Sequence, residues 1–367
     1  MGEIEIERKA PLKMIESLVE ILERKYGEEF KKSLPCPILE IAKFARRRIN
    51  PIVNNSIPEE IRIRMINDKE HNGTKLTDLE YLDTFIQIVS AFTRGCNKKA
   101  IYEEKFAHII TAQTGAGKTM LRKLITRRVA KPVIIDPDRY KQYRPDVDEI
   151  DKDKFGMLTG IDSYDHRDNL ASFAIENGYD LLYEVAPTKG GKLIGVDLQL
   201  LAEKGYIPSL NIMAVGDIVS AVGIHTRYEK ELEQSKNEPD PKPSKLTDLN
   251  RHDESVEAIE EIVKEYNSNN NVSIYIRGNE SNEFQPILIE REDIEYSRLN
   301  NFEIYKKLQE SSNKKYIESR QFEYDIEFIK AQMENRNAPN SQKEQLAKIE
   351  ERGQKIIDEK NRSDYGE

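Results

Sequence analysis

The chain has few of the residues that build disulfide frameworks, and it has no long apolar run. Only two of its 367 residues are cysteine, Cys36 and Cys96, and they lack the C-x-x-C spacing typical of zinc and redox sites. The most apolar window, 206–225, is interrupted by Pro208 and Asp217, which favours a buried strand and helix over a membrane span. The first residues contain no basic segment followed by an apolar stretch, as an export signal would. These absences predict a cytoplasmic protein with no membrane partner.

Positive charge is also in short supply. The chain has 57 Lys and Arg against 66 Asp and Glu, a net charge of −9, whereas proteins that bind nucleic acid through its phosphates carry surplus positive charge. The 18 Gly and 15 Pro are too few for a collagen-like or low-complexity sequence. We therefore expect a globular protein with no nucleic-acid partner. At this length we expect a main domain with helical additions rather than a single core.

The two ends of the chain have helical patterns. Residues 1–100 show the i, i+3, i+4, i+7 spacing of apolar residues that is typical of amphipathic helices. The clearest of these helices has one apolar side, formed by Leu79, Leu82, Ile86, Val89 and Phe92. Residues 61–66 alternate like a strand but follow a good helix start, so both structures stay open there. Residues 291–367 are charged and helical, and they predict either a packed appendage or a partly disordered segment.

The middle of the chain, residues 101–290, has short apolar runs separated by helical stretches, which is the pattern of a parallel sheet built from strand–helix–strand units. The predicted strands are 107–112, 132–136, 180–185, 210–215 and 272–277, and the predicted helices lie near 117–129, 166–177, 195–204, 217–234 and 253–267. Residues 235–246 contain prolines among charged residues and predict a loop. The predicted fold class is α/β, a parallel sheet flanked by helices, with an N-terminal helical region and a C-terminal helical extension.

The strongest motif predicts a phosphate-binding loop. Residues 112–119 read Ala-Gln-Thr-Gly-Ala-Gly-Lys-Thr and lie between a predicted strand and a predicted helix, as such a loop requires. Glycines let backbone N–H groups turn toward phosphate oxygens, and the helix N-terminus adds partial positive charge. Lys118 can reach the β- and γ-phosphates, and Thr119 can ligate Mg²⁺. The predicted nucleotide-binding residues are Gln113, Thr114, Gly115, Ala116, Gly117, Lys118 and Thr119.

The loop departs from the standard pattern at Ala112, where glycine is usual. An alanine there costs little if its φ is negative, but a positive φ would strain the turn. Neither Asn-Lys pair of the chain is followed by the x-Asp with which GTPases bind guanine, which argues against a GTPase.

Carboxylates follow two of the predicted strands. Asp136 and Asp138 lie just past the second strand, at the sheet edge where α/β folds gather their ligands. A carboxylate there can accept the proton of a substrate hydroxyl as that hydroxyl attacks the γ-phosphate. The alternative is that both acids cap the following helix. Glu184 ends another apolar strand and could either hold a water on Mg²⁺ or cap the strand.

Taken together, these motifs resemble the zeta toxins, which are bacterial P-loop kinases that phosphorylate the 3′-hydroxyl of the amino sugar in UDP-N-acetylglucosamine and so poison cell-wall synthesis. The resemblance extends over about residues 105–277. It is carried by 112–119, 135–142, 178–184, 212–215 and the pair Arg227-Tyr228. It implies a P-loop kinase-type sheet, ATP and Mg²⁺ as cofactors, a nucleotide-sugar substrate and an antitoxin as a possible partner.

The resemblance also implies catalytic roles. Asp138 matches the general base of the family, with Asp136 as its supporting neighbour. Arg227, which without the family is an ordinary helix-surface charge, would join Lys118 in neutralising the transferring phosphoryl group. A second family arginine falls at Lys245, and a lysine cannot make the two-pronged contact of an arginine.

Substrate binding is implied for a smaller set of acids. The substrate-binding acid of the family falls at Asp165 or Asp168, which compete for the position, and Glu184 is expected near both the substrate and the metal. Residues 185–189 lack the Gly and Arg that usually follow in the family. These departures predict a sugar pocket that differs from that of the family.

Several hypotheses follow from this sequence. The first is a zeta-toxin-like kinase of 101–290, and a variant of it takes another nucleotide such as NAD as acceptor. A rival from another class is a non-catalytic ATP-binding regulator, because Ala112, Lys245 and residues 185–189 depart from the family pattern. Residues 1–100 could restrain the kinase in cis, as antitoxins commonly do with a small helical bundle that covers the ATP site, or they could be a plain stabilising extension.

Overall fold

The computed structural model of the chain describes residues 12–45, 76–150 except 130, 158–235 except 186, 189–191 and 194, 246–278, 285–290, 293 and 296–364. It divides into two compact units. Unit 1 comprises the described residues within 1–109, 125–185 and 194–209, and unit 2 those within 110–124, 186–193 and 210–367. The predicted ambiguity at residues 61–66 lies outside the described residues.

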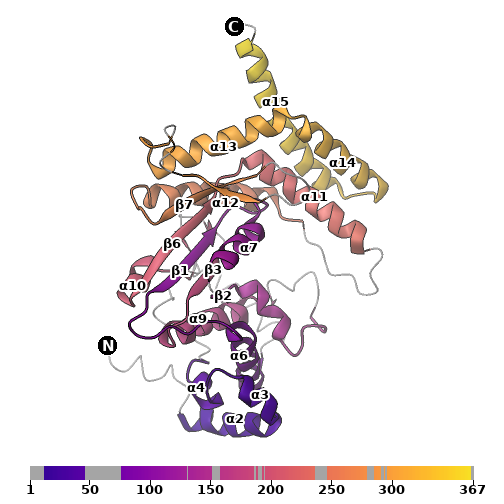
Figure 1. Cartoon of the computed structure of the whole chain (residues 1–367). Coiled ribbons are helices and arrows are strands. Elements are labelled where there is room, and N and C mark those ends of the chain that lie inside the picture. Colours follow the sequence, from indigo (N-terminus) through magenta and orange to yellow (C-terminus); the bar gives the residue numbers. More distant parts are fainter. Residues whose placement is uncertain are drawn as a thin grey trace, which may run out of the picture. The chain divides into compact units, whose positions relative to one another are not determined.

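The structure is a mixed α/β fold with a mostly parallel main sheet flanked by helices (Figure 1). The main sheet has the strand order β2-β3-β1-β6-β7-β8. Its strands are β1 (Lys105–Thr111), β2 (Val133–Ile135), β3 (Leu181–Val185), β6 (Tyr206–Met213), β7 (Val272–Arg277) and β8 (Pro286–Leu288). The first five confirm the predicted strands. The sixth was not predicted, and a separate two-stranded hairpin joins β4 (Pro187–Thr188) to β5 (Lys192–Leu193).

Strand pairing within each unit follows from the apolar runs. In unit 1, β2 runs parallel to β3 with Val133 opposite Leu181, and in unit 2, β6 runs parallel to β7 with Leu210 opposite Val272. All four of these residues are buried, as expected for strands covered on both faces. The edge strand β8 runs antiparallel to β7.

The helices of the sheet region lie close to their predicted ranges. They are α7 (Lys118–Arg128), α9 (Gly160–Glu176), α10 (Leu198–Glu203), α11 (Asp217–Ser235) and α12 (Leu249–Glu265), with two 3₁₀ turns, η1 (Pro137–Arg139) and η2 (Lys141–Tyr143). Helix α9 begins six residues before the predicted start at residue 166. Its first turns are polar yet buried, so the apolar periodicity that marks a helix is missing there.

The N-terminal helices are α2 (Leu12–Lys25), α3 (Glu28–Ser33), α4 (Ile38–Ala42) and α6 (Asp78–Thr93). Helix α6 begins at a reciprocal cap, in which the side chains of Thr77 and Glu80 each accept a hydrogen bond from the other's backbone N–H. Most of its side chains are buried. Phe92 packs edge-on against Tyr140 with ring centroids 4.9 Å apart, which makes α6 part of the core of unit 1.

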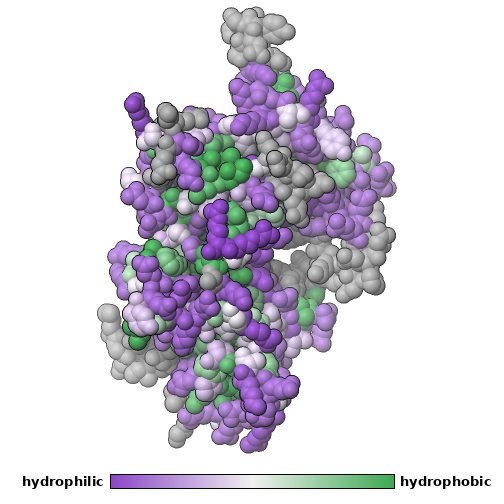
Figure 2. Space-filling model, in the orientation of Figure 1, coloured by the Kyte–Doolittle hydropathy of each residue, from purple (hydrophilic) through white to green (hydrophobic). Residues whose placement is uncertain are grey.

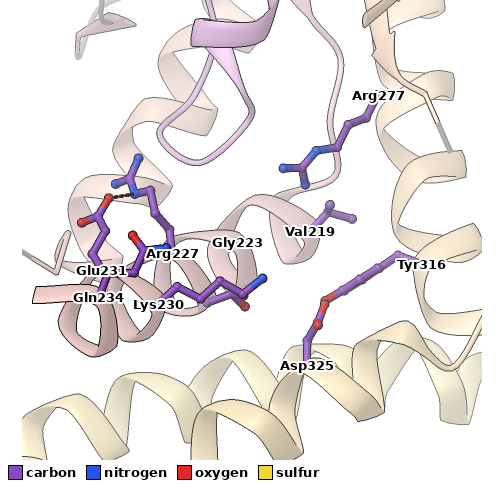
Figure 3. Close-up of a pocket in the computed structure, with 10 residues that line it drawn as sticks. Val219, Gly223, Arg227, Lys230, Glu231, Gln234, Arg277, Tyr316 and Asp325 are labelled. Carbon is purple, nitrogen blue, oxygen red and sulfur yellow. Dashed lines mark hydrogen bonds and ion pairs between the residues drawn. The ribbon is translucent and has the colours of Figure 1, made fainter. Parts of the chain in front are cut away.

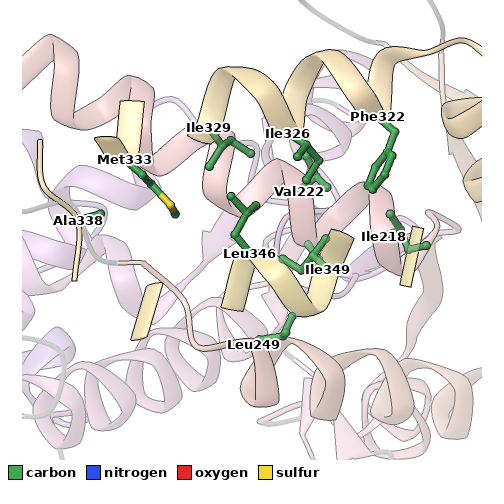
Figure 4. Packing of buried hydrophobic residues seen from close by; sticks show 11 residues of the cluster. Ile218, Val222, Leu249, Phe322, Ile326, Ile329, Met333, Ala338, Leu346 and Ile349 are labelled. Carbon is green, nitrogen blue, oxygen red and sulfur yellow. The ribbon is translucent and has the colours of Figure 1, made fainter. Parts of the chain in front are cut away.

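The C-terminal residues form three packed helices, α13 (Asn301–Glu318), α14 (Gln321–Asn335) and α15 (Asn340–Asp364). An apolar cluster joins α14 and α15 to α11 and α12 (Figure 4). Its members include Ile218, Val222, Leu249, Phe322, Ile326, Ile329, Met333, Leu346 and Ile349. Of the two predicted alternatives for this region, the packed appendage is the one that these residues adopt.

Polar and charged side chains cover most of the face seen in Figure 2, in keeping with the 34% of charged residues in the chain. None of the helices in the described ranges is both long and apolar enough to cross a membrane.

Candidate active site

The phosphate-binding loop connects β1 to α7 in unit 2, and its glycines have the backbone conformation that the motif requires. Gly115 has φ +83° and Gly117 has φ +100°, in the left-handed region that favours glycine. Ala112 is not among the described non-glycine residues with positive φ, so the departure from the standard pattern causes no strain of that kind. Lys118 begins α7, which places the loop at a helix N-terminus.

Three contacts within unit 2 hold the loop. The side-chain amide of Gln113 donates a hydrogen bond to the carbonyl oxygen of Val215 at 2.6 Å. The backbone N–H of Thr114 donates to the hydroxyl of Ser255 at 3.3 Å. Gly115 packs so closely on α11 that a Cβ added to it would lie 2.3 Å from the carbonyl oxygen of Ser220. The loop is thus fixed from the end of β6, from α11 and from α12.

A chain of polar contacts continues behind these, from buried Ser220 and His252 to a partly exposed ion pair. Ser220 Oγ lies 2.8 Å from His252 Nε2, and His252 Nδ1 lies 3.1 Å from an oxygen of Asp253. The guanidinium of Arg352 on α15 donates to both oxygens of Asp253, at 2.8 and 2.6 Å. Burial lowers the pKa of His252. Burial alone would raise the pKa of Asp253, but hydrogen bonds from Arg352 and His252 reverse the shift, and that pKa is lowered.

The contacts that run from Ser220 through His252 to Asp253 are like those within the catalytic triad of a hydrolase. The burial of Ser220 nevertheless excludes catalysis by this hydroxyl as a nucleophile. The side chain of Ser220 is fully buried, and its hydroxyl donates to the carbonyl oxygen of Gly216, just before α11, at 3.0 Å. A nucleophile must reach its substrate, so these residues support the loop rather than react.

Arg227 lies on α11, in the same unit as the loop. Its side chain is 54% exposed, and its Nε lies 3.6 Å from the carboxylate of Glu231 one turn further on. It lines a cavity of about 450 Å³, into which Lys230 and Arg277 also extend (Figure 3). Arg227 is therefore an accessible cation beside a cavity of unit 2.

The two acids after β2 belong to unit 1, and they differ in their surroundings. Asp136 is nearly buried, and its side chain accepts a hydrogen bond from the backbone N–H of Asp138 at 3.1 Å, so it caps η1. Asp138 is 81% exposed, with an oxygen 2.6 Å from Lys141 Nζ. The capping alternative therefore describes Asp136, whereas the carboxylate of Asp138 is accessible.

Asp165 and Asp168 lie on the buried polar stretch of α9, also in unit 1. Each is about 5% exposed or less. The guanidinium of Arg167 donates to an Asp168 oxygen at 2.7 Å and packs against Gly195, where an added Cβ would lie 2.2 Å from it. Tyr164 lies below that guanidinium, 5.0 Å away. A buried charged cluster of this density is rare without a function or a full set of partners.

The arginines that accompany these acids were not predicted from the sequence. The buried guanidinium of Arg144 donates to both oxygens of Asp146, at 2.8 and 2.7 Å, and also to Asp162 on α9. Arg144 follows η2 and gave no signal beyond its charge, because its partner on α9 is 18 residues away. The three acids Asp162, Asp165 and Asp168, with Arg167 among them, were a clue in the sequence.

The remaining predicted residues are Thr119, Glu184 and Lys245. Thr119 is exposed in the first turn of α7, and Glu184 is half-buried in β3. Lys245 lies outside the described residues. Across the ranges given above, no three His, Cys, Asp or Glu side chains gather into a metal-binding group. A nucleotide-bound Mg²⁺ needs no such cage, because phosphate oxygens and waters supply most of its ligands.

The family model described as Zeta toxin matches residues 93–286, which is just over half of the chain. The chain belongs to the zeta toxin family. The match begins at the last residue of α6 and ends at the first residue of β8, so α13–α15 lie beyond it. This membership confirms the resemblance that the motifs indicated.

Two curated relatives have the same family name. A curated "Toxin zeta" of Streptococcus agalactiae is 30% identical over 50% of this chain and 62% of its own length, and one of Enterococcus hirae is 31% identical over 43% and 54%. The chain thus spans less than two thirds of these relatives. A solved chain of the PezAT toxin-antitoxin system of Streptococcus pneumoniae is 22% identical, with a TM-score of 0.45 over 56% of this chain and 80% of that one.

Proposed function

We propose that the chain is an ATP-dependent kinase that transfers the γ-phosphate to a sugar hydroxyl of a nucleotide sugar, in the first instance the 3′-hydroxyl of UDP-N-acetylglucosamine. The observation that carries the proposal is the loop 112–119. It has two glycines in the left-handed region, a lysine that begins a helix and three contacts that hold it in place. The residues 101–290 would form the kinase domain, in line with the family match.

The residues would divide the chemistry as follows. The backbone N–H groups of 113–119 and the side chain of Lys118 would bind the β- and γ-phosphates. Thr119 would hold Mg²⁺, with Glu184 acting through a water, and the metal would offset the negative charge of the phosphates. Asp138 would accept the proton of the attacking hydroxyl, and its exposure leaves it open to a substrate. Arg227, and Lys245 in the place of a second arginine, would stabilise charge on the transferring group.

The acceptor would be bound by the acids of unit 1. Asp136 supports the base by ordering the turn that carries it. Asp165, Asp168 and Glu184 would bind the sugar hydroxyls as hydrogen-bond acceptors. The buried ion pair of Asp168 with Arg167 fixes the orientation of that carboxylate.

Substitution of the base tests the proposal most directly. Asp138→Ala should lower the rate of UDP-N-acetylglucosamine phosphorylation by roughly 10²–10⁴-fold while ATP affinity is kept, because general-base catalysis contributes about that much. Asp148→Ala is the matched control, since Asp148 is exposed in the same segment and has no proposed role. Unchanged turnover in Asp138→Ala would remove the proposed base.

The acceptor is tested separately, by measuring phosphate transfer from labelled ATP to a panel of nucleotide sugars and dinucleotides. Product with UDP-N-acetylglucosamine supports the first proposal. Product only with NAD would move the assignment to the other acceptor. Tight ATP binding without product on any acceptor would favour the non-catalytic regulator.

A further proposal concerns restraint of the kinase, either by residues 1–100 of the same chain or by a separate antitoxin protein. Because α6 is core to unit 1, we propose that it stabilises the kinase and that any restraint in cis comes from residues 1–75. Lys25, the last residue of α2, and Tyr26 after it contact Asp83 of α6, and Lys25 Nζ lies 2.7 Å from the Asp83 carboxylate. Deletion of 1–75 should raise the kinase rate if that segment restrains the site, whereas an unchanged rate would identify it as a stabilising extension.

A further inference from the structure

One guanidinium of unit 1 is held in place by an aromatic ring and by a glycine. Arg167 on α9 is only 4% exposed, and its Cζ lies 5.0 Å from the centre of the Tyr164 ring, a distance at which a cation and a ring attract each other. Gly195 lies against the same guanidinium, and a Cβ added there would overlap with Cζ and both terminal nitrogens. Its φ of +79° is also in the region that favours glycine. No side chain fits at residue 195, so the backbone there fixes where the guanidinium lies.

The guanidinium makes a two-donor contact with one oxygen of Asp168. Arg167 Nε donates to Asp168 Oδ1 at 2.7 Å, and Arg167 Nη2 lies 2.7 Å from the same oxygen. Both side chains are buried, and an ion pair withdrawn from water needs good geometry to offset its desolvation. Two donors from one planar group fix the direction of a carboxylate better than a single donor does. The orientation of the Asp168 carboxylate therefore depends on where Arg167 is held.

Two buried tyrosines show where in unit 1 this ion pair lies. Tyr140 follows Asp138 by two residues, and Tyr183 comes directly before Glu184. Burial raises the pKa of both tyrosines, and the charge of Arg167 opposes both shifts, so the guanidinium lies near each of them. The ion pair is thus near the carboxyl ends of β2 and β3, and ligands of α/β folds gather at that edge.

We propose that Arg167 is a positioning residue for the acceptor, and that Tyr164 and Gly195 hold it in place. Arg167 orients the carboxylate of Asp168, and this carboxylate accepts a hydrogen bond from a hydroxyl of the acceptor. The inference rests on the proposed function, in which Asp168 binds the sugar. It goes further in making acceptor affinity depend on the contact between α9 and the turn at residue 195. Arg167 acts through Asp168 and not on the reacting atoms.

Gly195→Ala tests the inference because it displaces Arg167 without removing it. The new Cβ overlaps with the far end of a flexible side chain, which can move aside. We expect the KM for UDP-N-acetylglucosamine to rise about tenfold or more, the effect of losing one hydrogen bond to a charged group. Neither kcat nor the KM for ATP should change, because substrate and transition state lose the same contact.

Gly205→Ala is the matched control. Gly205 also has φ +79°, but its added Cβ would lie 3.9 Å from Lys105 Nζ, an ordinary contact distance. This variant therefore has the same backbone strain as Gly195→Ala without the overlap. We expect it to keep the wild-type KM for the acceptor. Urea unfolding of each variant checks that the fold is kept.

Two further variants separate orientation from charge and from stability. Arg167→Lys keeps the positive charge but loses the two-donor contact, so the KM for the acceptor should still rise. In an Asp168→Asn background, Gly195→Ala should cause no further rise, because Arg167 acts through Asp168. A merely structural role of Arg167 predicts instead a lower free energy of unfolding with an unchanged KM for the acceptor.

The outcomes separate this inference from the proposed function. A selective rise of the acceptor KM in Gly195→Ala and Arg167→Lys, absent in Gly205→Ala, supports it. An unchanged acceptor KM in either variant, an equal rise in Gly205→Ala or a further rise in the Asp168→Asn background overturns it, while phosphate transfer by the wild type keeps the proposed function. If the wild type uses NAD instead, the same measurements are made with NAD. If it phosphorylates neither acceptor, the proposed function fails and this inference fails with it.

Discussion

Two glycines face each other where the phosphate-binding loop meets α11, and replacing each with alanine should have opposite effects. Gly115 has φ +83°, and its added Cβ would lie 2.3 Å from the carbonyl oxygen of Ser220 and 2.9 Å from the side chain of Ile224. A left-handed conformation costs a non-glycine residue about 1–2 kcal/mol. Overpacking against a helix carbonyl that cannot rotate away adds about 1–3 kcal/mol. Gly115→Ala should therefore lower the free energy of unfolding by about 2–5 kcal/mol, or force the loop away from α11.

Gly223→Ala acts on the helix side of the same contact. Its Cβ would lie 3.5 Å from the carbonyl oxygen of Gly115, an ordinary contact distance, and Gly223 is a helical residue. Alanine is favoured over glycine inside a helix by up to about 1 kcal/mol. We therefore expect an unchanged or slightly raised free energy of unfolding.

Urea unfolding followed by circular dichroism measures both variants, and ATP titration reports on the loop. A loop displaced by Gly115→Ala should bind ATP at least tenfold more weakly, roughly the loss of one good phosphate contact. Equal stability of Gly115→Ala and wild type, with unchanged ATP affinity, would refute the geometry described for the loop. Equal losses of unfolding free energy in Gly115→Ala and Gly223→Ala would contradict the expected difference between the two glycines.

Three further predictions concern the structure around the loop. A double-mutant cycle of Arg352→Ala and Asp253→Asn should give a coupling of about 1 kcal/mol in unfolding free energy, because the two-pronged pair is about one-third exposed and partly screened by solvent; additive effects would contradict it. Burial, reinforced by the charge of Arg336, lowers the pKa of His225 to about 4, so the unfolded chain binds more protons between pH 4 and 6.5 and stability falls with falling pH. Between pH 7.5 and 5, His225→Gln should reduce the measured stability loss by about 2 kcal/mol, and an identical pH profile would contradict the burial of this imidazole. Ile329→Ala should cost about 2–5 kcal/mol in urea unfolding because Ile329 is fully buried, whereas Tyr324→Ala on the exposed side of α14 should change little, and equal costs would contradict the packing in Figure 4.

The sheet could be predicted from the sequence because its strands are short, apolar and bounded by turn residues. Val133–Ile135 and Leu181–Val185 are mostly buried runs of that kind, and they pair in parallel. The three residues of β8 escaped prediction because an edge strand of this length has no periodicity to detect. The start of α9 escaped for another reason, since its buried side is polar and its partners, such as Arg144, lie elsewhere in the chain.

The candidate site was predictable only where one local segment defines it. Glycine spacing identified the loop because positive φ is a local requirement that few residue types meet. The cavity could not be predicted in this way. Arg227, Arg277 and Tyr316 come together only through the packing of α11, β7 and α13, and each of them separately is an ordinary surface residue in the sequence.

The C-terminal helices also support the loop through two separate chains of contacts. Asn313 on α13 donates to the Asp217 side chain at 2.6 Å and packs on Gly216, where an added Cβ would lie 1.9 Å from its amide oxygen. That turn begins α11, against which Gly115 rests. From α15, the Arg352 pair orients Asp253 next to His252, whose carbonyl oxygen accepts from the Ser255 hydroxyl at 2.6 Å. Ser255 in turn accepts the hydrogen bond of the Thr114 N–H. Because both series of contacts end on the loop, a substitution in α13 or α15 should alter nucleotide affinity even where the substituted residue does not touch the nucleotide. The region beyond the family match would then be part of the nucleotide-binding unit rather than an independent appendage.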